Sequence, residues 1–357
     1  AVGTSALYAN TTGASNVAVG SGALDANTTA SNNTAMGDGS LGANTTGASN
    51  TAVGKDALLV NTTASNNTAL GYQSLRLNTT GTNNVAVGQG ALDANTTANG
   101  NIAVGANSLG SNTTGASNIG IGHEALGANT TASNNTAIGY GSLDANTTGA
   151  NNTALGFSSL SANISGTLNT AVGRSALTSD TKGNHNVALG YNALTSQNFT
   201  SATDVHNTAI GSASGASVTT GIRNTLIGGI AGNGMTTGDN NTALGYTAMS
   251  AVVTGDGNTA VGTRAMFTHT TGAMNTGLGR DALYSNTVGN YNTAVGEGAL
   301  YTNVDGSNSV AVGRLALYSQ DPASAVEMHN VGVGYKAGQA VTTGIENTLI
   351  GGLAGDA

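Results

Sequence analysis

Residues 50–66 read NTAVGKDALLVNTTASN, and a closely similar stretch begins again at residue 67. The glycine of this stretch, Gly54, is one of a long series of anchor glycines that runs from Gly3 to Gly351. Nearly every step of the series has the same length of 17 residues, and only the steps that end at Gly211 and Gly334 are longer, each by four residues. A period this regular indicates a repeat architecture.

The repeating unit is N-T-A-(V/I/L)-G-x-x-(A/S)-L-x-x-N-T-T-(G/A)-x-x. A unit of this length cannot hold two helices and a turn, because helical repeats need more than about 30 residues. Thr and Val flank Ala as on a pleated strand, and glycine permits the positive φ of a tight turn. We therefore predict an all-β fold, a parallel β-solenoid or β-roll of 17-residue coils.

The composition argues against several classes of protein. Of 357 residues only 7% are charged and 4% aromatic, and there is no cysteine or tryptophan. Because the charged residues are dispersed, we predict that the chain is not an enzyme. The lack of thiolates argues against disulfides and structural zinc. A net charge of −8 with nine lysines and arginines predicts no nucleic-acid partner. No apolar run reaches about 18 residues, so we expect no membrane-spanning segment here. We also expect no cofactor.

The repeats differ between the two halves of the chain. Residues 1–177 form a uniform array, in which the residue after Asn-Thr-Thr alternates between glycine and alanine and indicates duplication of paired units. Residues 178–357 are more diverged and contain the two 21-residue units, 191–211 and 314–334. We expect both arrays to form a single continuous solenoid, with the four extra residues of each long unit in a loop.

An asparagine lies four residues before nearly every anchor glycine. In the uniform array this first asparagine row comprises Asn16, Asn33, Asn50, Asn67, Asn84, Asn101, Asn118, Asn135 and Asn152. Stacked coils would place these side chains about 4.8 Å apart, so their amides could form an inward-facing hydrogen-bonded ladder. The alternative is that asparagine is only a turn residue.

A second asparagine, seven residues after each of the first ten anchors, heads a glycosylation sequon. The candidate glycosylation sites are Asn10, Asn27, Asn44, Asn61, Asn78, Asn95, Asn112, Asn129, Asn146 and Asn163. A suitable transferase could attach a ladder of glycans to them. The alternative is that a Thr-rich turn merely resembles a sequon.

The long units carry the most varied chemistry. Their segments 195–206 and 318–329 contain Phe199, His206, Tyr318, Pro322 and His329. Because loops on rigid scaffolds often carry binding, these residues are candidates for contacts with a partner, a neighbouring chain or a glycan. The alternative is that each loop caps a groove between chains.

Two other residue sets are candidates for chemistry. The histidines do not pair at metal-ligand spacing in the sequence, so we predict exposed loop residues and no metal site. They are His123, His185, His206, His269 and His329. Aromatic residues that directly follow an anchor could form a stripe for sugar stacking, although turn residues are the simpler interpretation. They are Tyr72, Tyr140, Phe157, Tyr191, Tyr246 and Tyr335.

The recurring Asn-(Thr/Val)-Ala-(Val/Ile/Leu)-Gly motif resembles the head repeats of trimeric autotransporter adhesins, which are left-handed parallel β-rolls. The longer coil with Ala-Leu and Asn-Thr-Thr-Gly is similar to repeat regions of bacteriophage tail fibres. The adhesin repeat is shorter than the one found here. The resemblance covers nearly the whole chain and implies a homotrimeric fibre.

These observations predict a structural segment of an adhesin or phage tail fibre that spaces and displays host-attachment functions. We expect self-association into a homotrimer or a filament, because so short a coil is too thin to bury its Val and Leu rows alone. The resemblance implies a location outside the cell, on a cell surface or a virion, with a receptor or glycan as partner. The alternatives are an ice-binding β-solenoid with regular Thr rows, and a carbohydrate-degrading β-helix enzyme, for which no carboxylate cluster is visible.

Overall fold

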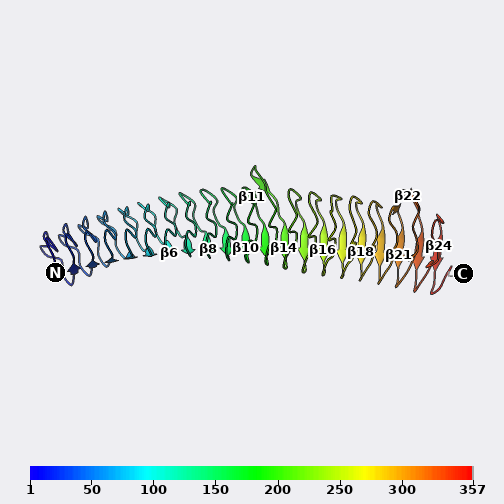
Figure 1. Cartoon of the computed structure of the whole chain (residues 1–357), viewed down its shortest axis with the longest axis horizontal. Coiled ribbons are helices and arrows are strands. Elements are labelled where there is room, and N and C mark those ends of the chain that lie inside the picture. The colour runs from blue at the N-terminus through cyan, green and yellow to red at the C-terminus, as the bar shows by residue number, and fades with distance from the viewer. Residues whose placement is uncertain (356–357) are drawn as a thin grey trace. The chain divides into compact units, whose positions relative to one another are not determined.

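A computed structural model describes residues 1–355 and contains about 20 coils built from short parallel strands. Each coil contributes one three-residue strand to a parallel sheet, and turns form the rest of the coil (Figure 1). Within residues 1–355 there is no helix, and hence none of the length and apolarity that a bilayer span needs. The predicted all-β parallel solenoid with its 17-residue repeat is confirmed.

The chain divides into two compact units, Ala1–Ser175 and Ala176–Ala357. In the first unit the strands are β1 (Val17–Val19), β2 (Thr34–Met36), β3 (Thr51–Val53), β4 (Thr68–Leu70), β5 (Val85–Val87), β6 (Ile102–Val104), β7 (Ile119–Ile121), β8 (Thr136–Ile138), β9 (Thr153–Leu155) and β10 (Thr170–Val172). Within the unit each strand pairs in parallel with the strand of the next coil. The register always joins equivalent residues, as in Ala52 with Ala69.

The second unit continues the same pattern and adds two short strand pairs. Its main strands are β12 (Val187–Leu189), β14 (Thr208–Ile210), β15 (Thr225–Ile227), β16 (Thr242–Leu244), β17 (Thr259–Val261), β18 (Thr276–Leu278), β19 (Thr293–Val295), β21 (Val310–Val312), β23 (Val331–Val333) and β24 (Thr348–Ile350). The additional pairs are β11 (Gly183–Asn184) with β13 (Thr203–Asp204) and β20 (Gly306–Ser307) with β22 (Val326–Glu327). Figure 1 shows β11 and β22 on the side of the coil opposite to the main strands.

The core of most coils consists of small residues and one leucine. In the coil of Gly54, Ala52, Ala57 and Leu58 are fully buried. The leucine has φ 51°, so its backbone lies in the left-handed region that non-glycine residues rarely adopt. The sequence argument that one chain is too thin to bury its leucine row is therefore wrong, because the tight turn after the anchor turns this side chain inward.

Two pairs of coils in the second unit, those of Gly215 with Gly232 and of Gly338 with Gly355, build the same core from different positions. In the first pair Gly215 and Gly232 stand where other coils have leucine, and Leu226 replaces the alanine of the strand. A Cβ atom added to either glycine would lie 2.7 Å from a methyl carbon of Leu226, which shows that this side chain fills the vacated space. The core volume is thus conserved, although in these coils the leucine comes from the strand and not from the turn after the anchor.

One of the four extra residues of each long unit lies just after its short strand pair. Gly183 pairs with Thr203, whereas Val187 pairs with Thr208, so the offset between paired residues increases by one along the chain. One extra residue must therefore lie between the two pairings, as in a β-bulge. The same change of offset occurs between β20–β22 and β21–β23.

Candidate functional site

The first asparagine row lies inside the coils. From Asn33 to Asn152 its side chains are fully buried, and Asn16 at the first coil is half-buried. The Oδ1 atom of Asn118 accepts a hydrogen bond from the backbone N–H of Asn135 at 2.9 Å, and Nδ2 of Asn135 donates to the carbonyl of Gly149 at 3.0 Å. These bonds join successive coils, but they run from side chain to backbone rather than from amide to amide.

In the uniform array the amide ladder expected for the first row occurs in the second row instead. Nδ2 of Asn129 donates to Oδ1 of Asn112 at 2.8 Å, and Nδ2 of Asn146 donates to Oδ1 of Asn129 at 3.0 Å. The same amide also donates to the carbonyl three residues on, which is that of Ala132 for Asn129. Each side chain therefore closes its own turn and bonds to its neighbour.

In the second unit the first row also has amide-to-amide bonds, because Nδ2 of Asn258 donates to Oδ1 of Asn241 at 3.2 Å and Nδ2 of Asn275 donates to Oδ1 of Asn258 at 3.1 Å.

The candidate glycosylation sites do not fit this arrangement. Asn10 is half-buried, and the side chains of the others are fully buried: Asn27, Asn44, Asn61, Asn78, Asn95, Asn112, Asn129, Asn146 and Asn163. A glycan on Nδ2 would remove a hydrogen-bond donor and would have to pass through the coil wall. The hypothesis of a glycan ladder on the folded chain is therefore corrected, and these sequons have a structural role.

His269 replaces asparagine in the second row and is fully buried. Its Nε2 and Nδ1 atoms lie 2.8 Å and 3.2 Å from the carbonyls of Gly272 and Asn286. Burial lowers the pKa of His269, although the two carbonyls act in the opposite direction. The expectation that this histidine is an exposed loop residue is wrong, because its position in the repeat is an inward one.

We expect His269 to make the stability of the second unit depend on pH. Because its pKa is lower in the folded state, the unfolded chain binds the extra proton first, and stability falls as the pH decreases below about 6.5. The loss is at most about 1.4 kcal/mol per pH unit. Urea unfolding of the wild type and of His269→Asn between pH 7.5 and 5 measures it. The variant restores the usual asparagine, so an equally steep decline in both proteins would contradict the assignment.

The outer face of the main sheet carries two exposed rows of side chains. In each strand the middle residue points inward, and the first and third point outward. The third position is always aliphatic, and Met36, Leu70 and Leu155 in the first unit are 44–46% exposed. The second unit repeats this at Leu189, Leu244 and Leu278, which are 43–45% exposed. Each unit thus presents a straight aliphatic row at the spacing of the coils.

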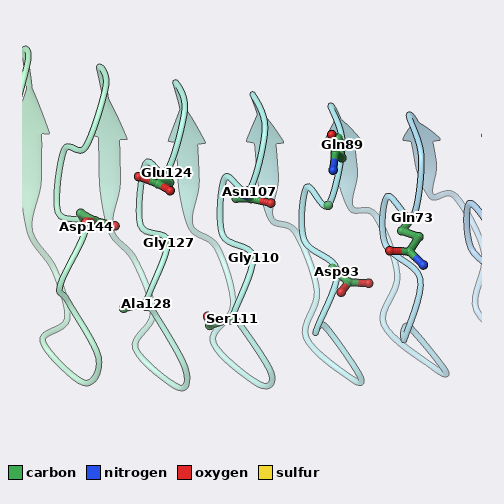
Figure 2. A pocket seen from close by; sticks show the side chains of 11 residues that line it. Gln73, Gln89, Asp93, Asn107, Gly110, Ser111, Glu124, Gly127, Ala128 and Asp144 are labelled. Atoms are coloured by element: carbon green, nitrogen blue, oxygen red, sulfur yellow. The ribbon is translucent and has the colours of Figure 1, made fainter.

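A groove of about 490 Å³ crosses several coils of the first unit. Figure 2 shows side chains of successive coils along it, among them Gln73, Asn107 and Glu124. The groove exists because Gly110 and Gly127 stand where neighbouring coils carry Asp93 and Asp144. Its charge is mainly negative, although Asp93 is paired with Arg76 at 2.9 Å.

The pKa of Asp144 in this groove is raised, first by partial burial and then by the charge of Glu124. The sequence pattern shows that Asp93 and Asp144 share a repeat position, but it singles out no residue of the groove as a binding site. The signal that could have indicated the groove is the pair of glycines, Gly110 and Gly127, which occupy that repeat position in the two coils between Asp93 and Asp144.

Within residues 1–355, stacks of three or more aromatic rings form between coils in two places. His123, Tyr140 and Phe157 follow successive anchors, with ring centroids 5.2 Å and 5.4 Å apart. A second stack, which sequence analysis missed, lies five residues after successive anchors and consists of Phe267, Tyr284, Tyr301 and Tyr318. Its rings are nearly parallel and 4.9–5.2 Å apart.

Sugar rings stack on aromatic faces, but within these stacks each inner ring has a neighbour on both faces. The two stacks therefore leave mainly ring edges for a ligand. Tyr72 and Tyr246 are exposed, at 47% and 58%, and within residues 1–355 neither of them stacks on another ring. A continuous sugar-binding stripe along the anchors is not formed.

The long coils place their candidate contact residues differently. Phe199 and Pro322 are buried, Tyr318 ends the second aromatic stack, and His206 and His329 are exposed. The backbone N–H of Phe199 donates to Oδ1 of Asp180 at 3.0 Å. Burial raises the pKa of Asp180, and this carboxylate holds the long loop against the preceding coil. Of these five residues, only the two histidines and the outer side of Tyr318 are thus available to a partner.

The prediction that the histidines stay apart is also wrong. The rings of His185 and His206 stack with centroids 4.7 Å apart, and Asp204 lies beside them. The two histidines are separated by one long coil, and both lie five residues before an anchor. Counting in repeat positions rather than in residues would have brought them together.

The chain matches no protein-family model, no curated protein sequence and no solved structure.

Proposed function

We propose that the chain is a structural segment of a fibre on a cell surface or a virion, and that copies associate side by side, as a homotrimer, to space and display attachment functions. The observation that carries this proposal is the exposed aliphatic row on the outer face of the main sheet. Contiguous apolar surface of this kind marks an interaction site on a soluble protein.

The regular spacing of the row favours another copy of the same chain as its partner. Its side chains recur once per coil, so only a partner with the same axial spacing can cover them over many coils. A second copy of the chain has the same axial spacing because it has the same repeat. The resemblance to adhesin heads and tail-fibre repeats supports three copies and an extracellular location.

The alternative of an ice-binding solenoid is supported less well by the same face. Ice-binding rows need a regular series of small side chains. Here the first strand position changes between Thr34, Val85 and Ile102, and the third changes between Met36, Val53 and Leu70. Of the two Thr rows of the sequons, the first donates its hydroxyls to the next coil, as Thr45 does to the carbonyl of Thr62 at 3.0 Å. The second row, which includes Thr97, Thr114 and Thr131, is exposed but is a single row outside the main sheet.

Charges placed on the aliphatic row are expected to convert the assembly to monomers. The test variant combines Val87→Lys, Val104→Glu and Ile121→Lys, with alternating signs so that neighbouring coils do not repel each other. The control places the same charges at Thr97, Thr114 and Thr131, which are exposed outside the main sheet. Light scattering on size-exclusion peaks measures the mass, and circular dichroism verifies the fold.

We expect a trimer mass for the wild type and the control, and a monomer mass for the test variant. A folded wild-type monomer over the whole concentration range would overturn the proposal, as would equal masses for the test variant and the control. If the wild type were a monomer and also showed thermal hysteresis in ice-growth measurements, the ice-binding alternative would replace the proposed fibre function.

A further inference from the structure

The bulge of the first long coil brings three potential metal ligands to one side of the backbone. Asn184 pairs with Asp204, and the next main-sheet pairing is offset by one more residue. Opposite His185 there are consequently two residues, Val205 and His206. Val205 is fully buried, whereas Asp204 and His206 on either side of it are exposed.

The donor atoms of these three residues lie close together. One ligand atom from each of His185, Asp204 and His206 lies within 4.8 Å of the others. Nδ1 of His185 is 3.4 Å from Oδ1 of Asp204. Two ligands of a tetrahedral ion with bonds of about 2.1 Å are about 3.4 Å apart, so this pair already has a chelating separation.

One of these atoms lacks a partner of the usual kind. Nδ1 of His185 is shielded from solvent and makes no hydrogen bond, because its approach to Asp204 is not aligned for one. Oδ1 of Asp204 accepts a hydrogen bond from Nδ2 of Asn184 at 3.1 Å, which orients the carboxylate. A buried nitrogen without a hydrogen bond, beside an oriented carboxylate, is the arrangement that an ion would complete.

We propose that His185, Asp204 and His206 bind one divalent first-row transition metal ion. Two imidazoles and a carboxylate suit Cu²⁺, Ni²⁺ and Zn²⁺, with Cu²⁺ bound most tightly, and they suit Ca²⁺ or Mg²⁺ poorly. The stacked rings turn about their side-chain bonds to direct both nitrogens at the ion, and the exposure of His206 leaves room for this rotation. Water occupies the remaining coordination position.

The second long coil provides a natural comparison. The equivalent residues there are Asn308, Glu327 and His329, so asparagine stands in place of His185. Nε2 of His329 lies 3.2 Å from Oε2 of Glu327. This second cluster has the same bulge and a similar carboxylate, but only one imidazole, and we expect it to bind the same ions much more weakly.

Bound metal would fasten the long coil to the coil before it. His185 belongs to one coil, and Asp204 and His206 belong to the next, so an ion on all three bridges the position where the repeat is interrupted. This function is independent of the proposed side-by-side assembly, because the ligands lie at β11 and β13, away from the main sheet.

Titration of the untagged full chain with Cu²⁺ or Ni²⁺ in a calorimeter tests the site. We expect one ion per chain, and electron paramagnetic resonance of the Cu²⁺ form should show hyperfine splitting from two imidazole nitrogens. His185→Asn copies the residue of the second long coil and is expected to weaken binding by more than about tenfold, since even the partners of metal ligands contribute about 10- to 100-fold. His123→Asn is the control and should bind as the wild type does.

The complementary variant Asn308→His completes the second cluster and should raise the stoichiometry to two ions per chain. Because Asn308 and His185 both have φ 60°, either exchange preserves the local backbone. The proposal is overturned if the wild type binds no ion, if His185→Asn binds as tightly as the wild type, or if the resonance spectrum shows no nitrogen splitting. A stoichiometry that stays at one in Asn308→His would also count against the geometry.

Discussion

Replacement of Gly105 by alanine is expected to destabilise the first unit by more than about 4 kcal/mol, in the range that only a few kinds of substitution reach. Gly105 has φ +133°, a conformation that is unfavourable for residues with a side chain. Its added Cβ would also lie 2.5 Å from the carbonyl oxygen of Gly122 and 2.6 Å from the carbonyl carbon. Both atoms belong to backbone, so the next coil would have to move away.

The matched control is Gly100→Ala, five residues earlier. Gly100 has φ +68°, where other coils carry serine or asparagine, and its added Cβ would meet only the Ser117 hydroxyl at 3.9 Å. We expect a cost of about 1 kcal/mol. Urea unfolding followed by circular dichroism, with amide hydrogen exchange to locate the opened coils, compares the two. Similar losses in both variants would show that the close contact between anchors does not limit the fold.

The second large effect is expected from Asn135→Leu. Leucine keeps the size of the side chain but removes Oδ1, which accepts from the backbone N–H of Asn152 at 2.9 Å. That N–H would remain buried without a partner, whereas the carbonyl of Gly149 would keep its bond from Asn146. We expect a loss of about 2–4 kcal/mol, from one unsatisfied donor and one lost bond.

The neighbouring residue supplies the control for this change. Asn134 is exposed with φ 61°, and Leu168 occupies the equivalent place in a later coil with φ 59°. Asn134→Leu should therefore cost no more than about 1 kcal/mol. The sharpest readout is the exchange rate of the Asn152 amide proton, which should rise only in Asn135→Leu. An unchanged rate there would mean that this asparagine row does not hold the coils together.

The period and the alternation of Thr-Ala-Val were sufficient to predict the coil and the inward strand position. They could not assign the amide ladder, because both asparagine rows recur at the same spacing and differ only in what lies opposite them. In the first row of the uniform array, each Oδ1 accepts a hydrogen bond from the backbone N–H that lies just before the next strand, as Oδ1 of Asn118 does from Asn135. This backbone donor takes the place of the side-chain amide of the neighbouring asparagine. In the second row the neighbouring amide is the nearest donor, as at Asn129.

The sequence also did not reveal the backbone conformation of the leucine row or the contact between two histidines, because both depend on the three-dimensional arrangement of the coils. Leu58 belongs to the regular leucine row of the repeat, but its positive φ could not be read from a residue type that avoids this conformation. His185 and His206 looked unrelated because their separation in the sequence resembles no metal-binding motif. The bulge at Val205, which depends on where the chain absorbs its extra residues, turns that separation into a contact.

The constant register of the strands affects how such a gene can change. Because coil after coil presents equivalent residues to its neighbours, unequal recombination that adds or removes whole coding repeats leaves every interface within an array intact. Insertions of other lengths require a special accommodation such as the bulged coils. Length is therefore the inherited property that this architecture can vary most freely, and related genes should differ by whole repeats before they differ in the core.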